Sequence, residues 1–195
     1  KEMDQVTKNR LKLIFIAGMF ALPVISAWLI FNNPQWLEGG ETKNYGELIK
    51  PVITSDLTEY VLDGDEKDLN ALKGRWVLLH IDTDAQCLEL CEKTVHLIHQ
   101  LHVLLNKDAK RLKRVYLNKS LPDITPFLSQ APDLYMFHWN DQLLEELKSK
   151  VGDLADDDVL LMDPLGNIMM KYSKDADPYG IQKDLKHLFK ASQIG

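Results

Sequence analysis

The 195-residue sequence lacks the short motifs that usually identify nucleotide-binding proteins, hydrolases and zinc proteases. It has no phosphate-binding loop ending in GK[ST], no GxGxxG, no GxSxG and no HExxH, so the residues give these classes no support. Only two cysteines are present, too few for a disulfide-rich mini-domain or a four-thiolate zinc site. The formal net charge of −6 argues against nucleic acid as a partner, because nucleic-acid binding needs a basic field.

Charge is also missing from a long stretch near the N-terminus. No charged side chain occurs between Lys12 and Glu38, and residues 13–31 read LIFIAGMFALPVISAWLIF. At a rise of about 1.5 Å per residue this run covers roughly 28 Å, close to the hydrocarbon thickness of a bilayer. The sequence therefore predicts a transmembrane helix over residues 13–31, which makes the lipid bilayer one partner of the chain.

The flanks of this span predict its orientation. Basic residues are concentrated in residues 1–12, whereas the first charged residues after the span are Glu38 and Glu41. The positive-inside rule then places residues 1–12 in the cytoplasm as a short tail and the rest of the chain outside. The alternative is a cleaved signal peptide, although the apolar run is longer than the usual hydrophobic region of such a peptide.

The remaining residues divide into a linker and one globular domain. Residues 32–47 contain the breakers Asn-Asn-Pro and Gly-Gly, and residues 48–195 have the pattern of a folded domain. We expect strands at residues 57–62, 76–81 and 112–117, a long helix from Cys87, a hairpin at residues 159–172 and a final helix. A strand–helix–strand crossover followed by a hairpin predicts an α/β fold with a mixed, thioredoxin-like sheet flanked by helices.

The cysteine pair is the clearest candidate for chemistry. A spacing of four on a helix places Cys87 and Cys91 on one face, and we expect both at the solvent-open lip of the crossover. We expect Cys87 to be the exposed nucleophile or first metal ligand, because a helix N-terminus lowers the pKa of a thiol, and Cys91 to be the resolving thiol or second ligand. Two thiolates suit a soft Cu(I) ion, and the same pair can form a disulfide. A purely structural disulfide is the alternative.

In the order of its motifs the chain resembles the Sco (SenC) family of membrane-anchored, thioredoxin-like assembly factors. The resemblance covers the N-terminal span, KGRWVLL at residues 73–79, the Cys87-x-x-x-Cys91 pair and LLMDPLG at residues 160–166. It implies copper as the cofactor and cytochrome c oxidase subunits or assembly factors as partners. It also implies a periplasmic domain at the bacterial inner membrane, and an assembly factor or chaperone rather than a turnover enzyme.

Two departures from the family pattern keep alternatives open. The prolines of the family's CPxxCP motif are missing, and Ala155 stands where the family has its third copper ligand, a histidine. We expect His138 to be the best substitute for that ligand. The alternative function is a scaffold or accessory subunit of an oxidase complex with a degenerate, non-catalytic domain. A thiol peroxidase would need a basic residue beside Cys87, where the sequence has acids.

The other candidates are surfaces. Four bulky side chains cluster before the predicted helix at residues 143–151 and are costly to expose without a partner. These residues, which we expect to form a partner surface, are Tyr135, Met136, Phe137 and Trp139. His80 is expected to pack inside its strand. The histidines at 96, 99 and 102 are expected to line a solvated helix face, and residues 153–158 to form a solvated acidic turn.

Overall fold

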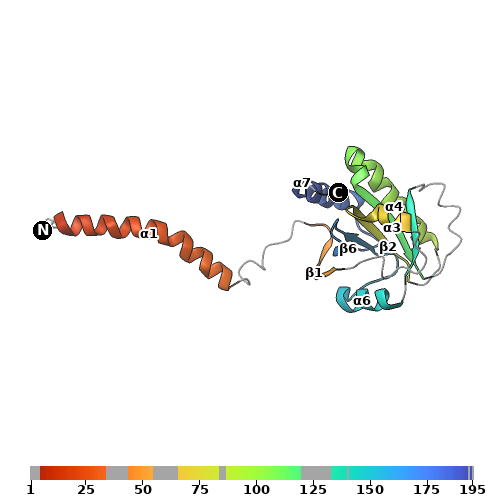
Figure 1. Ribbon diagram of the computed structural model, residues 1–195, viewed down its shortest axis with the longest axis horizontal. Helices are drawn as coiled ribbons and strands as arrows, with labels where there is room; N and C mark the ends of the chain where they lie inside the picture. Colours follow the sequence, from red (N-terminus) through yellow and green to blue (C-terminus); the bar gives the residue numbers. More distant parts are fainter. Residues whose placement is uncertain are drawn as a thin grey trace. The chain divides into compact units, whose positions relative to one another are not determined.

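The computed structural model describes residues 5–33, 44–54, 66–83, 87–119, 133–139, 141–192 and 194. The chain divides into two compact units, residues 1–43 and 44–195. The first unit holds helix α1 (Gln5–Asn32), drawn at the red end of the chain in Figure 1. This helix contains residues 13–31, and none of its side chains is buried. Among the described residues, α1 is the one helix long and apolar enough to cross a membrane.

The second unit is built on a six-stranded mixed sheet in the order β1-β6-β5-β2-β3-β4. The strands are β1 (Glu47–Thr54), β2 (Trp76–Ile81), β3 (Leu112–Asn118), β4 (Leu134–His138), β5 (Val159–Met162) and β6 (Asn167–Tyr172). Strands β2, β3 and β4 are parallel, and β5 and β6 form an antiparallel hairpin beside β2. Strand β1 pairs antiparallel with β6 at the edge of the sheet.

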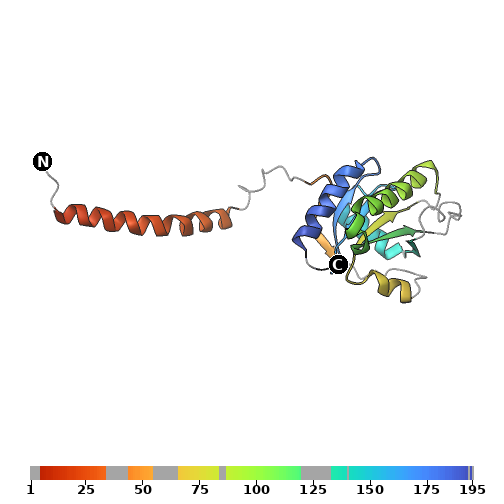
Figure 2. The same cartoon turned by 90° about the horizontal axis from the view of Figure 1, so that it is seen from above.

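Helices cover both faces of this sheet (Figures 1 and 2). Their bounds are α3 (Glu66–Leu72), α4 (Glu89–Leu105), the 3₁₀ helix η2 (Asn106–Arg111), α6 (Asp141–Val151) and α7 (Pro178–Ala191). The core residues divide into two clusters: α4 and α7 pack on one face of the sheet, and α3 and α6 on the other. The thioredoxin-like fold predicted from the sequence is confirmed.

The central strand β2 shows why the sequence gives this two-sided core. All six side chains of WVLLHI are buried, as expected for a near-continuous apolar run covered on both faces. Leu78 belongs to the cluster under α4 and α7, and Leu79 to the cluster under α6. His80 has the same parity as Leu78, so its side chain lies on the α4 face, where the cysteines are.

Two edge strands were not predicted from the sequence. Strand β1 contains Pro51, which cannot donate to a ladder and is tolerated only at an edge. Asp184 of α7 fixes the two residues that precede β1. Its carboxylate accepts hydrogen bonds from the backbone N–H groups of Tyr45 and Gly46, both at 2.9 Å. Strand β4 lies in a segment where we expected no strand, and the strand expected at residues 57–62 lies outside the described residues.

Candidate functional site

The two cysteines lie at the start of α4 and are joined by a disulfide. Leu88 caps the helix, so that Cys87 precedes it and Cys91 lies in its first turn, with Cα atoms 5.1 Å apart. Cys87 is half-buried, whereas Cys91 is 1% exposed and packs in the core cluster under α4. We expected both residues at a solvent-open lip. That is wrong for Cys91, because it shares the sheet-facing side of α4 with Val95 and Ile98.

The charges around the first turn of α4 are partly compensated. Glu89 and Glu92 lie in this turn, where they favour the helix by facing its positive end but disfavour a nearby thiolate. Lys93 pairs with Glu89 at 2.7 Å, and its hydrogen bond lowers the pKa of Glu89. The exposed lysine thus offsets one of the two acids beside the cysteine pair.

A tyrosine and an aspartate lie beneath the disulfide. The sulfur of Cys91 is 3.7 Å from the hydroxyl of Tyr116 on β3, and this hydroxyl donates a short hydrogen bond to Asp82. Both residues are at most 1% exposed. Burial, followed by the hydrogen bond to Asp82, raises the pKa of Tyr116. The inner sulfur therefore faces a neutral hydroxyl group that stays protonated.

A histidine–aspartate pair lies beside this tyrosine. The Nε2 atom of His80 is 2.8 Å from Oδ1 of Asp157, and the two residues are 0% and 4% exposed. The rings of His80 and Tyr116 pack with their centroids 5.0 Å apart. The second ring nitrogen of His80, Nδ1, is buried and has no hydrogen-bond partner among the described residues. A buried polar atom without a partner is uncommon and needs an explanation.

Asp157 reaches His80 because the turn before β5 folds over the carboxyl end of β2. The backbone of Ile81 accepts from Asp157 N–H at 2.9 Å and donates to the carbonyl of Asp158 at 3.0 Å. Asp156 accepts hydrogen bonds from the backbone N–H and the hydroxyl of Thr83. The expectation of a solvated acidic turn is therefore wrong for Asp157 and Asp158, which are 4% and 2% exposed.

These contacts bring three kinds of metal-binding atom together. One nitrogen of His80, the sulfur of Cys91 and one carboxylate oxygen of Asp157 all lie within 4.8 Å of one another. Sequence reasoning placed Cys91 correctly on the helix that follows β2 but missed the other two residues. The signal in the sequence was a histidine inside an otherwise apolar buried strand, which we had interpreted only as a packed side chain.

His138 is not part of this group. It is the last residue of β4, half-buried, and its Cα pairs in register with Asn118 of β3. In the group of three potential metal ligands found among the described residues, the histidine is His80. The structure thus brings a histidine of the central strand to Cys91, and a ligand role for His138 stays a prediction.

The expected partner surface is mostly interior. Phe137 and Trp139 are each 2% exposed and belong to the core cluster under α6, so neither offers a surface to a partner. Tyr135 and Met136 are half-buried in the same strand. The reason is that this segment forms strand β4 beside β3, and strand pairing turns alternate side chains into the core.

The histidines of α4 are engaged with other groups. His99 accepts a hydrogen bond at Nδ1 from the guanidinium of Arg114, a fully buried residue, at 3.1 Å. His102 interacts through Nε2 with the carbonyl of Ala109 at 3.0 Å, and His96 with Gln100 at 2.8 Å. Burial, and then the charge of Arg114, lowers the pKa of both His99 and His102. The contacts of His99 and His102 hold α4 to β3 and η2, whereas that of His96 lies within α4. Among the described residues, the group that could hold a metal ion contains none of these three histidines.

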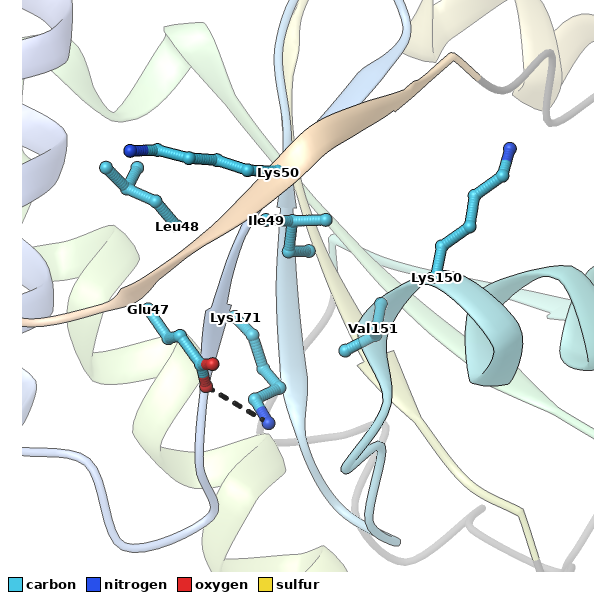
Figure 3. A pocket seen from close by; sticks show the side chains of 7 residues that line it. All are labelled: Glu47, Leu48, Ile49, Lys50, Lys150, Val151 and Lys171. Atoms are coloured by element: carbon cyan, nitrogen blue, oxygen red, sulfur yellow. Dashed lines mark ion pairs between the residues drawn. The ribbon is translucent and has the colours of Figure 1, made fainter. Parts of the chain in front are cut away.

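A basic pocket of about 130 Å³ lies between β1, β6 and the end of α6. Figure 3 shows that Lys50 and Lys150 point away from each other, while Lys171 points toward Glu47 and pairs with it at 3.2 Å. Lys171 also donates to the carbonyl of Asp153. Because the lysines do not converge on one point, this pocket has no geometry for holding an anion.

Comparison with known proteins places this site in a family. A family model described as transmembrane-like, thioredoxin-like, C-terminal domain matches residues 76–192. No curated protein matches the chain. The matched region begins at β2 and includes the cysteine pair, His80 and Asp157.

Solved structures share the fold. The apo Sco1 protein of Thermus thermophilus matches with a TM-score of 0.57 at 15% identity, over 77% of this chain and 99% of that chain. Yeast Sco1 with copper bound matches at 0.49 and 14%, over 63% and 80%. A thiol:disulfide interchange protein of a Bacteroides species matches at 0.48 and 13%, over 78% and 95%. The match to the Thermus protein confirms the Sco-like fold expected from the sequence.

Proposed function

The chain belongs to the family of transmembrane-like proteins with a thioredoxin-like C-terminal domain, and we propose that it is a membrane-anchored thiol–disulfide protein that assists cytochrome c oxidase assembly. The observation that carries this proposal is the asymmetry of the disulfide: Cys87 is accessible, and Cys91 is buried beside Tyr116. An outer sulfur for a partner and an inner sulfur for resolution is the arrangement that exchange requires.

The exchange follows from this geometry. A thiolate of the partner protein attacks the sulfur of Cys87, and the bond to Cys91 breaks. The Cys91 sulfur leaves with the electron pair, next to the hydroxyl of Tyr116, and takes up a proton. A second partner thiol then attacks the partner's sulfur in the mixed disulfide and releases Cys87 as a thiol. The partner loses two electrons as its cysteines join, and this chain gains them; the reverse sequence reduces a partner disulfide.

A contact surface for the partner lies beside the outer sulfur. Leu88 follows Cys87 directly and is 64% exposed. An exposed leucine at this position offers apolar contact to a polypeptide that approaches the disulfide. We propose that the partner is a cysteine-bearing subunit or assembly factor of the oxidase. The Sco-like fold and the membrane span together support this choice.

Copper handling is the second candidate, with copper as cargo. The observation in its favour is that an imidazole nitrogen of His80 lies within 4.8 Å of the Cys91 sulfur. Two thiolates and an imidazole suit Cu(I). The donor set thus fits copper once the disulfide is reduced, although the third ligand comes from β2 rather than from the turn before β5, where Ala155 stands.

Complementation tests the cysteine chemistry against the scaffold alternative. In cells from which the gene is deleted, the wild-type chain is expected to restore cytochrome c oxidase activity, and the Cys87→Ser/Cys91→Ser double variant to leave it near the level of the deletion. The His138→Gln chain is the matched control and is expected to restore activity. Full restoration by the double variant would establish the scaffold. If added copper, and not a thiol reductant, restored oxidase activity in cells with the double variant, the result would favour copper delivery as the function.

We further propose that α1 crosses the inner membrane with the sheet domain on the periplasmic side. With all its apolar side chains exposed and basic residues at its N-terminal end, α1 has the features of a positive-inside anchor. The full chain is expected to remain in the membrane after alkaline extraction. Phe20→Lys with Val24→Lys should release it, because each charge at a helix centre costs about 2.5–3.5 kcal/mol.

The matched control adds the same charges at the end of the helix. Asn32→Lys with Asn33→Lys should leave the chain in the membrane, because lysines near a helix end reach the interface. A C-terminal alkaline phosphatase fusion reports the orientation, since this enzyme becomes active only outside the cytoplasm. An inactive, stable fusion would contradict the proposed orientation.

A further inference from the structure

We propose that reduction of the disulfide opens a buried zinc site made by Cys87, Cys91, His80 and Asp157, so that the chain holds Zn²⁺ only in its dithiol form. The inference rests on the proposed function in one respect, namely that the disulfide is reducible. It goes further by assigning ligands outside the cysteine pair. These ligands are a histidine of the central strand and an aspartate of the turn before β5.

The donor atoms determine the choice of ion. The set comprises two sulfurs, one imidazole nitrogen and one carboxylate oxygen. Zn²⁺ accepts all three donor types in tetrahedral sites, whereas Cu(I) prefers the soft donors and gains little from a carboxylate. The two thiolates and Asp157 carry three negative charges, and Asp82, also buried, lies close by. A dication neutralises more of this buried charge than a monocation does.

His80 has an unused lone pair in either tautomer. If Nε2 carries the proton, it donates to Asp157 at 2.8 Å, and the lone pair of Nδ1 meets no partner among the described residues. If Nδ1 carries the proton, the lone pair of Nε2 faces the Asp157 carboxylate at the same distance, an arrangement that a cation between the two atoms stabilises. A metal ion that also binds Asp157 must therefore bind Nε2, the ring nitrogen that faces the carboxylate, with the proton on Nδ1.

The distances explain why the site depends on reduction. The atoms of Cys91, His80 and Asp157 lie within 4.8 Å of one another, and ligand atoms of tetrahedral zinc are about 3.3–3.8 Å apart, given bonds of about 2.0–2.3 Å. To reach the spacing of zinc ligands, the most widely separated of these atoms must move together by about 1 Å. In the disulfide, each sulfur is uncharged and fixed to the other. Reduction supplies two thiolate ligands and frees both side chains to rotate toward the nitrogen and the carboxylate.

Cobalt provides the direct test, because Co²⁺ takes the place of Zn²⁺ and reports its ligands in visible absorption. Full-length protein in detergent is reduced, freed of reductant and titrated with Co²⁺. We expect one ion per chain, with the d–d bands of a tetrahedral site and thiolate charge-transfer bands, and loss of both on adding Zn²⁺. Oxidised protein should show neither. His80→Gln should weaken binding by more than about 100-fold, which exceeds the usual effect of a residue outside the ligand sphere.

Matched measurements separate the possible failures. His138→Gln should bind Co²⁺ as the wild type does. A thiol count of two in reduced wild type, without Co²⁺ or Zn²⁺ binding, overturns the zinc site and leaves thiol exchange standing. A pair that cannot be reduced overturns both. If His80→Gln does not fold, X-ray absorption of the zinc-loaded wild type decides: two sulfur and two nitrogen or oxygen ligands support the site, and a sulfur-only or sulfur-free shell overturns it.

Discussion

Replacing Cys91 by serine in the full-length chain is expected to trap the partner protein as a stable mixed disulfide on Cys87. The Cys87 thiolate still attacks a disulfide of the partner and displaces one of its two sulfurs as a thiol, but no Cys91 thiol remains to attack the mixed disulfide and release the partner. Cys87→Ser should give no such adduct, because the remaining sulfur at position 91 is 1% exposed and covered by the core under α4. We expect at least about ten-fold more adduct with Cys91→Ser, as the access of a thiol to its target controls exchange.

Acid quenching, alkylation and non-reducing electrophoresis measure the adduct, and mass spectrometry identifies the partner. A thiol reductant should remove it, and the double serine variant should show none. Equal adduct from both single variants would contradict the division into outer and inner sulfurs. Adduct from Cys87→Ser alone would reverse it, and would require the first turn of α4 to open in the membrane-bound protein.

The parts of the fold that sequence predicted are those in which burial leaves a strong local pattern. The run WVLLHI of β2 and the hairpin of β5 and β6 were predicted because every side chain, or every second one, must be apolar there. The edge strands β1 and β4 were missed. An edge strand is covered on fewer sides, and β1 also contains Pro51, so that its residues give a weaker signal than those of a central strand.

The candidate site was only half predictable, for a topological reason. The two cysteines are four residues apart, and this spacing at the start of a helix is enough to predict that they meet. His80 and Asp157 are 77 residues apart, and they meet only because β5 lies antiparallel to β2 and brings the turn before it over the end of that strand. A long-range contact of this kind depends on strand order, which local periodicity does not encode.

Tyr116 was missed for the same reason. It lies on β3, one strand away from His80, and the parallel register places their Cα atoms opposite each other. The sequence around it, LKRVYLN, indicates a buried strand but not which side chain faces the cysteines. The parity of the sheet decides this, and parity follows from the pairing register.

Replacing Trp139 by alanine is expected to lower the free energy of unfolding of the sheet domain substantially. The effect should not be limited to a weaker contact with a partner. Trp139 is 2% exposed in the core under α6, and its backbone N–H donates to the carbonyl of Asn118 at 3.1 Å. Truncation of a buried tryptophan costs about 3–5 kcal/mol, which for a domain of this size lowers the melting temperature by about 10 °C or more. Thermal unfolding followed by circular dichroism measures it.

Tyr135→Ala, in the strand β4 that directly precedes Trp139, is the matched control. Tyr135 is half-buried, its ring stacks on Phe137 with centroids 6.4 Å apart, and its hydroxyl accepts a hydrogen bond from Lys113 at 3.5 Å. Partial exposure limits the expected cost to about 1 kcal/mol. If Trp139→Ala kept the wild-type melting temperature while lowering partner capture by Cys91→Ser, the side chain would belong to a docking surface. The core position of β4 would then be wrong.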